Sequence, residues 1–235
     1  RDKRKTPAAI NQGISAVKKL AEECGERGLI GAVEWGGVRS VKRLKQRGVR
    51  VGNWLTIEEV EQVLNGTTSR RDKALLALLL GCGLRRDEAA QLRRRHVQIR
   101  EERMVLVDIV GKGQRTRSVT VPDWAAEPLT KFMDLSTPDQ KDDEDGFIFR
   151  LTESGVWWVV KETCGRVLKK NRTIAPHDLR RTYARLSVEG KADMRQLQAE
   201  LGHSSIQTTE RYVGAGQKFG KGQGAGDAIA IGKKK

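Results

Sequence analysis

The sequence has few cysteines, no long apolar run and too few acidic residues to balance its basic ones. Its three cysteines, Cys24, Cys82 and Cys164, are widely spaced and form no CxxC pair. We therefore expect reduced packing residues, with neither a disulfide framework nor a metal site. The longest apolar run, 74–80, is far too short to span a bilayer, and no signal peptide opens the chain. These shortages predict an intracellular protein.

The shortage of acidic residues gives the chain a strongly positive charge. It has 45 basic and 30 acidic residues, for a formal net charge of +15. Such an excess indicates a polyanionic partner, and nucleic acid is the first candidate, although charge alone does not exclude an anionic membrane surface. More than half of the excess falls in residues 1–52. At 235 residues the chain is long enough for one full core and a smaller unit.

The basic first part of the chain carries one clear helical pattern. Residues 8–24 predict one amphipathic helix, because apolar side chains recur at helical spacing, namely Ile10, Ile14, Val17 and Leu20, with Ala21 on the same side. A second short helix is expected over 35–45, followed by a basic linker over 46–53. Two helices are too few for a stable domain.

A second domain is expected to open at the capping box that Thr56 forms with Glu59. Residues 70–80 are apolar nearly all round, which is typical of a helix at the centre of a core. A hairpin follows, because 103–110 and 115–121 alternate around the turn residues GKGQ. In its first strand we predict one shared side for Val105, Val107 and Ile109.

Two candidate residues lie at a predicted helix start within PHDLRRTYARL. Asp178 is expected to cap this helix, which places His177 and Arg180 at its N-terminus. Unpaired backbone N–H groups and a partial positive charge there suit an oxyanion or a phosphate. Taken alone, however, an HxxR pair is common by chance.

Further candidates lie in turns or on short helices. His203 follows a helix that Gly202 ends, and Tyr212 comes nine residues later on a short helix that Ser205 can cap. Arg85 lies in a turn before another helix, and Lys112 lies at the hairpin tip. Each of these side chains, taken singly, is more often a packing residue or a solvated charge.

Together these motifs resemble the tyrosine recombinase (phage integrase) family in order and spacing. The matching motifs are GLRRDE, the hairpin lysine, HxxR, LGH and the later tyrosine. Within GLRRDE, Glu88 stands in the place of the family's acid that helps hold the arginine. The resemblance covers about 56–213. It implies a mainly α fold with a small antiparallel β-sheet (α+β), preceded by a short helical DNA-binding segment.

The resemblance also implies a domain organisation. Residues 1–52 are expected to be part of a helical core-binding domain with its basic linker, so that the chain begins within that domain. Residues 53–213 would be the catalytic domain, and the glycine-rich segment 214–235 a flexible C-terminal tail.

The activity implied is that of a site-specific DNA recombinase or integrase, which cleaves and rejoins strands through a 3′-phosphotyrosyl intermediate. The family's pattern assigns six catalytic residues, namely Arg85, Lys112, His177, Arg180, His203 and Tyr212. No metal, cofactor, ATP, membrane or small-molecule substrate is expected. Expected partners are double-stranded DNA and further copies of the chain, in a tetramer on two DNA sites joined through the C-terminal tail, in the cytoplasm at the nucleoid. Two alternatives remain open at this point: a type IB topoisomerase, and a DNA-binding module with a degenerate pocket.

Overall fold

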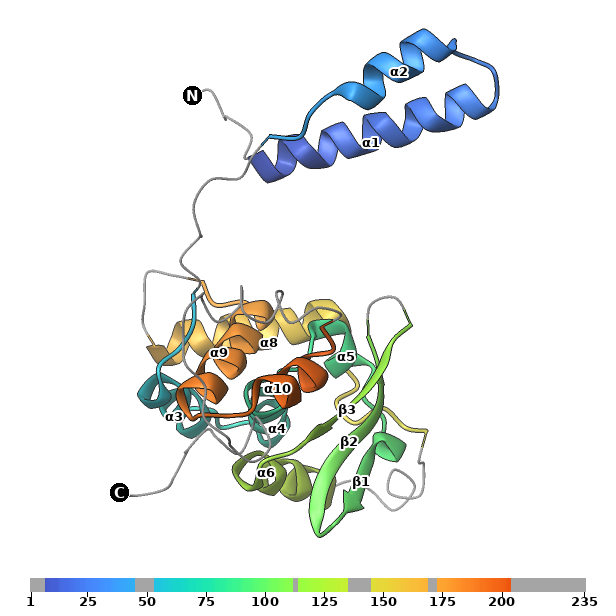
Figure 1. Ribbon diagram of the computed structural model, residues 1–235. Helices are drawn as coiled ribbons and strands as arrows, with labels where there is room; N and C mark the ends of the chain where they lie inside the picture. Colours follow the sequence, from blue (N-terminus) through green and yellow to red (C-terminus); the bar gives the residue numbers. More distant parts are fainter. Residues whose placement is uncertain (1–6, 45–52, 112–113, 135–144, 169–172, 204–235) are drawn as a thin grey trace. The chain divides into compact units, whose positions relative to one another are not determined.

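The computed structural model describes residues 7–44, 53–111, 114–134, 145–168 and 173–203 (Figure 1). The chain divides into two compact units, Arg1–Val51 and Gly52–Lys235. The fold is mostly helical with one small antiparallel sheet, as predicted. Within the described ranges, no helix combines the length and the apolar character needed to cross a membrane.

The first unit consists of helices α1 (Pro7–Glu26) and α2 (Ala32–Ser40), which pack against each other. The helix predicted over 8–24 is observed, although Val17 and Leu20 of its apolar stripe are 56% and 64% exposed. Among the residues of α1 whose side chains the structure describes, Ala21 is the buried apolar one. Two helices cover only one face of each other, so the rest of the apolar stripe faces solvent.

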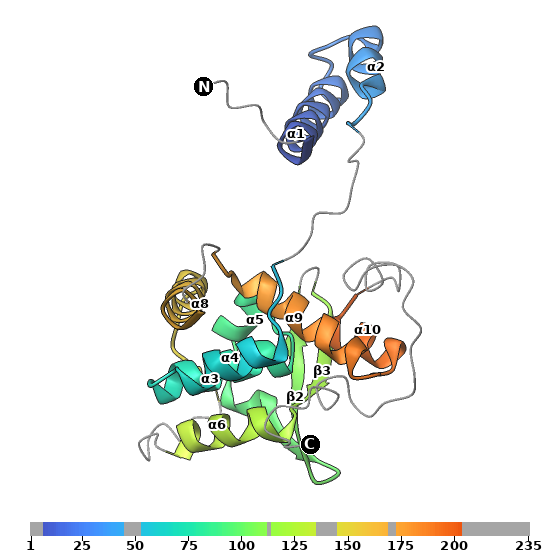
Figure 2. The same cartoon turned by 90° about the vertical axis from the view of Figure 1, so that its left-hand side faces the viewer.

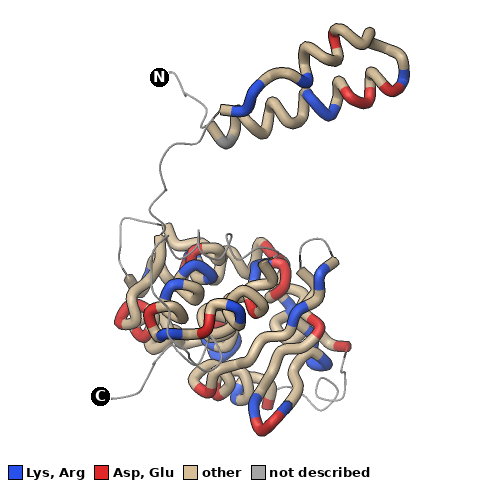
Figure 3. The backbone as a smooth tube through the Cα atoms, viewed as in Figure 1, with Lys and Arg blue, Asp and Glu red and all other residues tan. Residues whose placement is uncertain are grey.

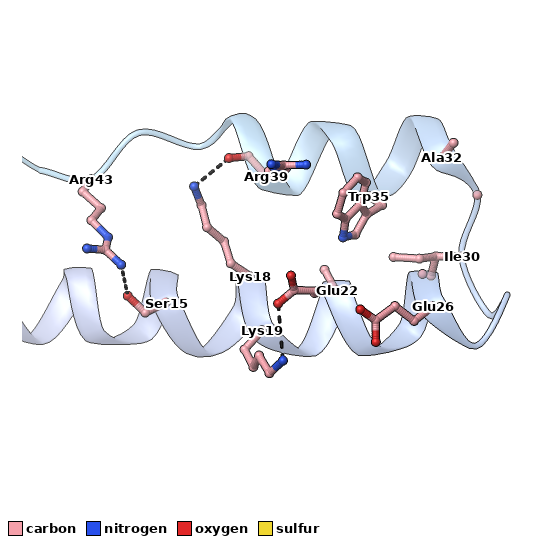
Figure 4. Close-up of a pocket in the computed structure, with 13 residues that line it drawn as sticks. Ser15, Lys18, Lys19, Glu22, Glu26, Ile30, Ala32, Trp35, Arg39 and Arg43 are labelled. Carbon is pink, nitrogen blue, oxygen red and sulfur yellow. Dashed lines mark hydrogen bonds and ion pairs between the residues drawn. The ribbon is translucent and has the colours of Figure 1, made fainter. Parts of the chain in front are cut away.

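Polar contacts hold α1 to the segment that contains α2 (Figure 4). Lys18 Nζ donates to the Arg39 carbonyl at 2.6 Å, and Arg43 Nη2 donates to Ser15 Oγ at 3.0 Å. Between the helices lies a hollow whose lining includes both basic and acidic side chains, with Trp35 on its α2 side.

The described helices of the second unit are α3 (Ile57–Asn65), α4 (Arg70–Gly81), α5 (Arg86–Ala90), the 3₁₀ turn η1 (Arg94–His96), α6 (Asp123–Asp134), α8 (Glu153–Leu168), α9 (Pro176–Glu189) and α10 (Met194–Leu201). The unit is built around α4, whose side chains are buried from Ala74 to Leu80. The capping box at the start of α3 is confirmed, since Thr56 Oγ1 accepts from the Glu59 N–H at 3.3 Å and the Glu59 carboxylate accepts from the Thr56 N–H at 3.0 Å. Helix α4 packs against both α6 and α9 (Figure 2).

The sheet has three antiparallel strands in the order β1-β2-β3, namely Val97–Arg100, Arg103–Val110 and Thr116–Thr120. The hairpin of β2 and β3 was predicted, but its inward face was not. Leu106 and Ile109 are the buried residues of β2. The register shifts between them, and Asp108 has a φ of 52°. A bulge of this kind inserts one residue and moves the following side chains to the other face.

The start of α9 also differs from the prediction. Ala175 occupies the N-cap position, and Asp178 lies in the first turn, where its carboxylate accepts from the Ala175 N–H at 3.1 Å. Asp178 therefore caps the helix from inside it. Helix α10 ends at Gly202 as expected, with a left-handed φ of 61°.

Candidate active site

The centre of the site is one buried carboxylate surrounded by three arginines. Glu88 Oε1 accepts from Arg85 Nη1 at 2.6 Å, and Glu88 Oε2 accepts from Arg117 Nη2 at 2.8 Å. Arg180 Nη1 lies 3.9 Å from the same Oε2 atom. We call these four residues the arginine cluster. One negative charge faces three positive charges, so the cluster keeps a net positive charge.

The electrostatics of Glu88 follow from this arrangement. Burial raises the pKa of its carboxyl group, but the charge and hydrogen bond of Arg117, the Arg85 backbone N–H and the charge of Arg180 outweigh that effect. Its pKa therefore lies below the ordinary value. Glu88 stays ionised at neutral pH and holds the arginines together.

Arg180 joins two loops that are far apart in the sequence. Its guanidinium is buried, and it donates to the Gly83 carbonyl at 2.5 Å and to the Leu201 carbonyl. Gly83 comes just before Arg85, and Leu201 comes just before Gly202 and the turn at His203. The arginine from α9 therefore fixes both turns that carry the neighbouring site residues.

Two glycines let backbone segments approach the cluster closely. A Cβ at Gly83, whose φ is +57°, would lie 2.4 Å from Cδ1 of the Tyr183 ring. A Cβ at Gly111 would lie 3.0 Å from both Arg85 Nη1 and Glu88 Oε1. The end of β2 therefore runs directly against the Arg85–Glu88 pair, which a side chain at position 111 would displace.

The pKa values of both candidate histidines, His177 and His203, are lowered, so both imidazoles are neutral at pH 7. Burial, followed by the charges of Arg180, Arg85 and Arg117, lowers the pKa of His203 to about 4. Burial of part of the ring and the charges of Arg181 and Arg180 also lower the pKa of His177, although this residue is exposed as a whole. A neutral imidazole offers one N–H donor and one acceptor nitrogen.

A pocket of about 170 Å³ opens beside the cluster. Its described lining residues are Arg85, Gly111, Arg115, Thr116, Arg117, Ala199, Gly202 and His203. Arg85 and His203 were both predicted site residues, and the structure brings them to one pocket. None of the described lining residues is acidic, so the pocket suits an anion.

Sequence reasoning missed Arg117, which is buried in β3 and contacts Glu88 directly. A signal was present, because Arg117 occupies the same alternating phase as Val119 and Val121, both of which are buried. A basic residue on the inward side of a strand needs a buried partner. Glu88 is that partner, but nothing local in the sequence pairs two residues that are 29 positions apart.

Two of the six predicted residues, Lys112 and Tyr212, lie outside the described residues. Of the other four, Arg85 and His203 line the pocket, and Arg180 lies 3.9 Å from Glu88 in the arginine cluster. His177 lies at the start of α9, close enough to lower the pKa of His203. Among the described residues, no group of three or more His, Cys, Asp or Glu side chains is arranged to hold a metal ion.

The excess positive charge of the site is local and does not extend over the whole second unit. Figure 3 shows basic and acidic positions interspersed over the helices and strands of the second unit. What distinguishes the site is that several guanidinium groups converge on one carboxylate at the start of α5. Planar guanidinium donors beside neutral imidazoles are suited to bind the oxygens of a phosphate group.

A site of this kind on a mostly helical domain with a three-stranded sheet defines the class of protein. The chain belongs to the phage integrase family, whose family model matches residues 53–218. It is 30% identical over 169 residues to tyrosine recombinase XerA of Thermococcus onnurineus, covering 68% of this chain and 57% of that relative. It is 34% identical over 150 residues to tyrosine recombinase XerD of Staphylococcus epidermidis, covering 61% of this chain and 50% of that relative.

The fold is also similar to that of a solved structure. The structure of the Tn1549 transposon integrase in complex with circular intermediate DNA matches 92% of this chain and 78% of its own, with a TM-score of 0.64 and 18% identity. The chain spans about half the length of the curated relatives it matches.

Proposed function

We propose that this chain is the catalytic part of a site-specific tyrosine recombinase that cleaves and rejoins duplex DNA through a 3′-phosphotyrosyl intermediate. The observation that carries the proposal is the arginine cluster. A single carboxylate compensates only one of the three guanidinium charges, and the described lining of the adjacent pocket includes no acidic residue. Family membership and the names of the relatives, two tyrosine recombinases and a DNA-bound integrase, support the same activity.

In this proposal, Tyr212 attacks the scissile phosphate and forms the covalent link. Negative charge develops on the non-bridging oxygens, where Arg85 and Arg180 supply charge and hydrogen bonds. His203 donates a further hydrogen bond, and His177 accepts the phenol proton or stabilises the phosphorane.

Lys112 would protonate the departing 5′ oxygen. Gly111 supports this role, since it directly precedes Lys112 and lies against Arg85. The phosphotyrosyl bond conserves the energy of the broken linkage, so that a strand can be rejoined without ATP.

The test begins with a site selected by footprinting and built into a nicked duplex that traps the covalent product. Wild-type protein should give a protease-sensitive protein–DNA adduct, and Tyr212→Phe should bind the same duplex without forming one. An adduct with Tyr212→Phe would exclude this residue as the nucleophile. Relaxation of supercoiled DNA without strand exchange between two sites would instead identify a type IB topoisomerase.

The domain organisation and the assembly belong to the same proposal. We infer that 1–52 is part of a DNA-binding domain with its linker, that 53–213 is the catalytic domain, and that 214–235 is the tail through which copies join into a tetramer on two DNA sites. Deleting 214–235 should weaken assembly more than single-site binding, and equal loss of both would contradict the role of the tail. Such DNA substrates would place the protein at the nucleoid.

A further inference from the structure

We propose that Arg117 is a third phosphate-binding arginine of the site, in addition to its ion pair with Glu88. This inference rests on the proposed function, because it names a further contact to the ligand of the same pocket.

Arg117 has more donors than protein acceptors. The residue is 8% exposed, and its Nη2 atom donates to Glu88 at 2.8 Å. Its Nε and Nη1 atoms are also buried, and neither has a hydrogen-bond partner among the described residues. Buried donors on a charged group are seldom left without acceptors in folded proteins, so these two N–H groups point to a bound ligand that accepts from them.

The pocket beside Arg117 can supply that acceptor. Arg117 lines it together with Arg85 and His203, and the lining described above includes no acid. A water molecule could accept one hydrogen bond, but it would leave the excess charge of the cluster uncompensated. A tetrahedral oxyanion provides several acceptor oxygens as well as the missing negative charge. The unpaired donors therefore favour a phosphate group.

Arg117 is also held in place from the side of the turn at His203. A Cβ at Gly202 would lie 2.9 Å from Arg117 Cδ, so the absence of a side chain there makes room for the arginine stem. The left-handed φ of Gly202 further disfavours other residues. The same turn that presents His203 thus packs on Arg117, which fixes both donors at one pocket.

A purely structural role for Arg117 does not account for its unpaired donors. Glu88 already receives a hydrogen bond from Arg85 and the nearby charge of Arg180. A counter-ion for this carboxylate needs only one charged donor, which a lysine can provide. The two roles therefore make different predictions for Arg117→Lys.

The experiment measures sulfate binding by thermal unfolding of the full chain, in sulfate against chloride at equal ionic strength. Sulfate should raise the melting temperature of wild-type protein, because a ligand that binds only the folded state stabilises it. Arg117→Lys and Arg117→Met should each weaken sulfate affinity by about 10-fold or more, the effect of losing charge-assisted hydrogen bonds. The control is Arg100→Met, an exposed arginine of β1, which should leave the affinity unchanged.

An affinity for sulfate in Arg117→Lys within about 2-fold of wild type, well under the loss of one hydrogen bond, would overturn the proposal and leave Arg117 as a counter-ion. If Arg117→Met does not fold, Arg117→Lys still decides, because it keeps the charge beside Glu88. On the nicked duplex, Arg117→Lys should slow adduct formation with little change in DNA binding. Adduct formation at the wild-type rate would also overturn the proposal.

The two proposals fail in different ways. Suppose that sulfate binding depends on Arg117 but wild-type protein forms no adduct on any selected site. The pocket is then an anion-binding site, and the proposed recombinase activity is contradicted. If wild-type protein forms the adduct while sulfate binding is indifferent to Arg117, the activity stands and the role of Arg117 is wrong.

Discussion

The Tyr183 hydroxyl donates a 2.5 Å hydrogen bond to Glu200 and thereby links the middle of α9 to the end of α10. Both side chains are buried. Burial raises the pKa of Glu200, and hydrogen bonds from Tyr183, Gln196 and the Thr120 backbone N–H only partly oppose this effect. The Tyr183 ring also fills the space beside Gly83. The pair therefore supports the two turns that Arg180 joins.

Removing the Tyr183 hydroxyl should destabilise the second unit without changing its shape. We expect Tyr183→Phe to lower the free energy of unfolding by about 1–3 kcal/mol, because it leaves the buried Glu200 carboxyl short of a donor. Urea denaturation at pH 7 measures this difference. In the matched variant Glu200→Gln, an amide oxygen can still accept from Tyr183, so the loss should be smaller. Equal losses in the two variants would argue against this account.

The pKa of His203 should lie well below the ordinary value for histidine, and it should change when an anion binds in the pocket. The chain has three histidines, so their ring protons can be assigned by NMR with single substitutions. In chloride, the pKa of His203 should lie at about 4. Added sulfate should raise it, because an anion in the pocket stabilises the imidazolium form. The His96 ring, which lies outside the pocket lining, serves as the internal control and should not respond.

The same shift predicts how stability depends on pH. The pKa of His203 is lowered in the folded state from its ordinary value of 6.5, so the unfolded chain binds the proton more readily. Stability should therefore fall as the pH drops from about 6.5 towards about 4. His203→Gln should flatten this part of the profile in urea denaturation. An unchanged slope would show that His203 is not the responsible group.

Neutralising Glu88 should be among the most damaging single changes. Glu88→Gln would leave three guanidiniums close together without their shared anion, and breaking a buried ion pair typically costs about 3–5 kcal/mol. The control is Glu153→Gln, because the ion pair of Glu153 with Arg86 is exposed and such pairs are worth about 0–1 kcal/mol. Sulfate should restore more stability to Glu88→Gln than to the control. Equal losses from both substitutions would contradict the central role of Glu88.

Lys112 offers a chemical test of the leaving-group step. If it protonates the departing 5′ oxygen, Lys112→Ala should slow cleavage by roughly 10²–10⁴-fold, the range for a positioned acid. A substrate with sulfur as the bridging 5′ atom needs no proton, so it should restore cleavage by this variant. Arg85→Ala should stay defective on the same substrate, because it acts on the non-bridging oxygens. Without rescue, the acid must be sought elsewhere, first at His177.

Local signals in the sequence predicted the elements that depend on local interactions. The Thr56–Glu59 capping box, the apolar helix α4 and the paired strands β2 and β3 are each set by residues close in the chain, and each is observed. The inward face of β2 was missed because the bulge at Asp108 changes the phase of the strand. A bulge is difficult to predict from the alternation of apolar and polar residues in the sequence.

Only the site residues that belong to sequence motifs were predicted. The motifs around Arg85, Arg180 and His203 were visible, and so was the role of Glu88 beside Arg85. The burial of Arg117 and its contact with Glu88 depend on how β3 lies against α5, a long-range arrangement. The same holds for the Tyr183–Glu200 hydrogen bond, because the two residues lie on different helices.

The hydrogen bonds of Arg180 to the carbonyls of Gly83 and Leu201 also bear on when the site comes into existence during synthesis. The two acceptors lie 97 positions before and 21 positions after the arginine. A nascent chain that has reached only Arg180 lacks the Leu201 carbonyl, the Gly202 turn and His203, although it already has all three guanidiniums. Such long-range closure comes late in folding. The three arginines are therefore synthesised before the residues around Leu201 that complete the pocket in which, we propose, they bind one phosphate.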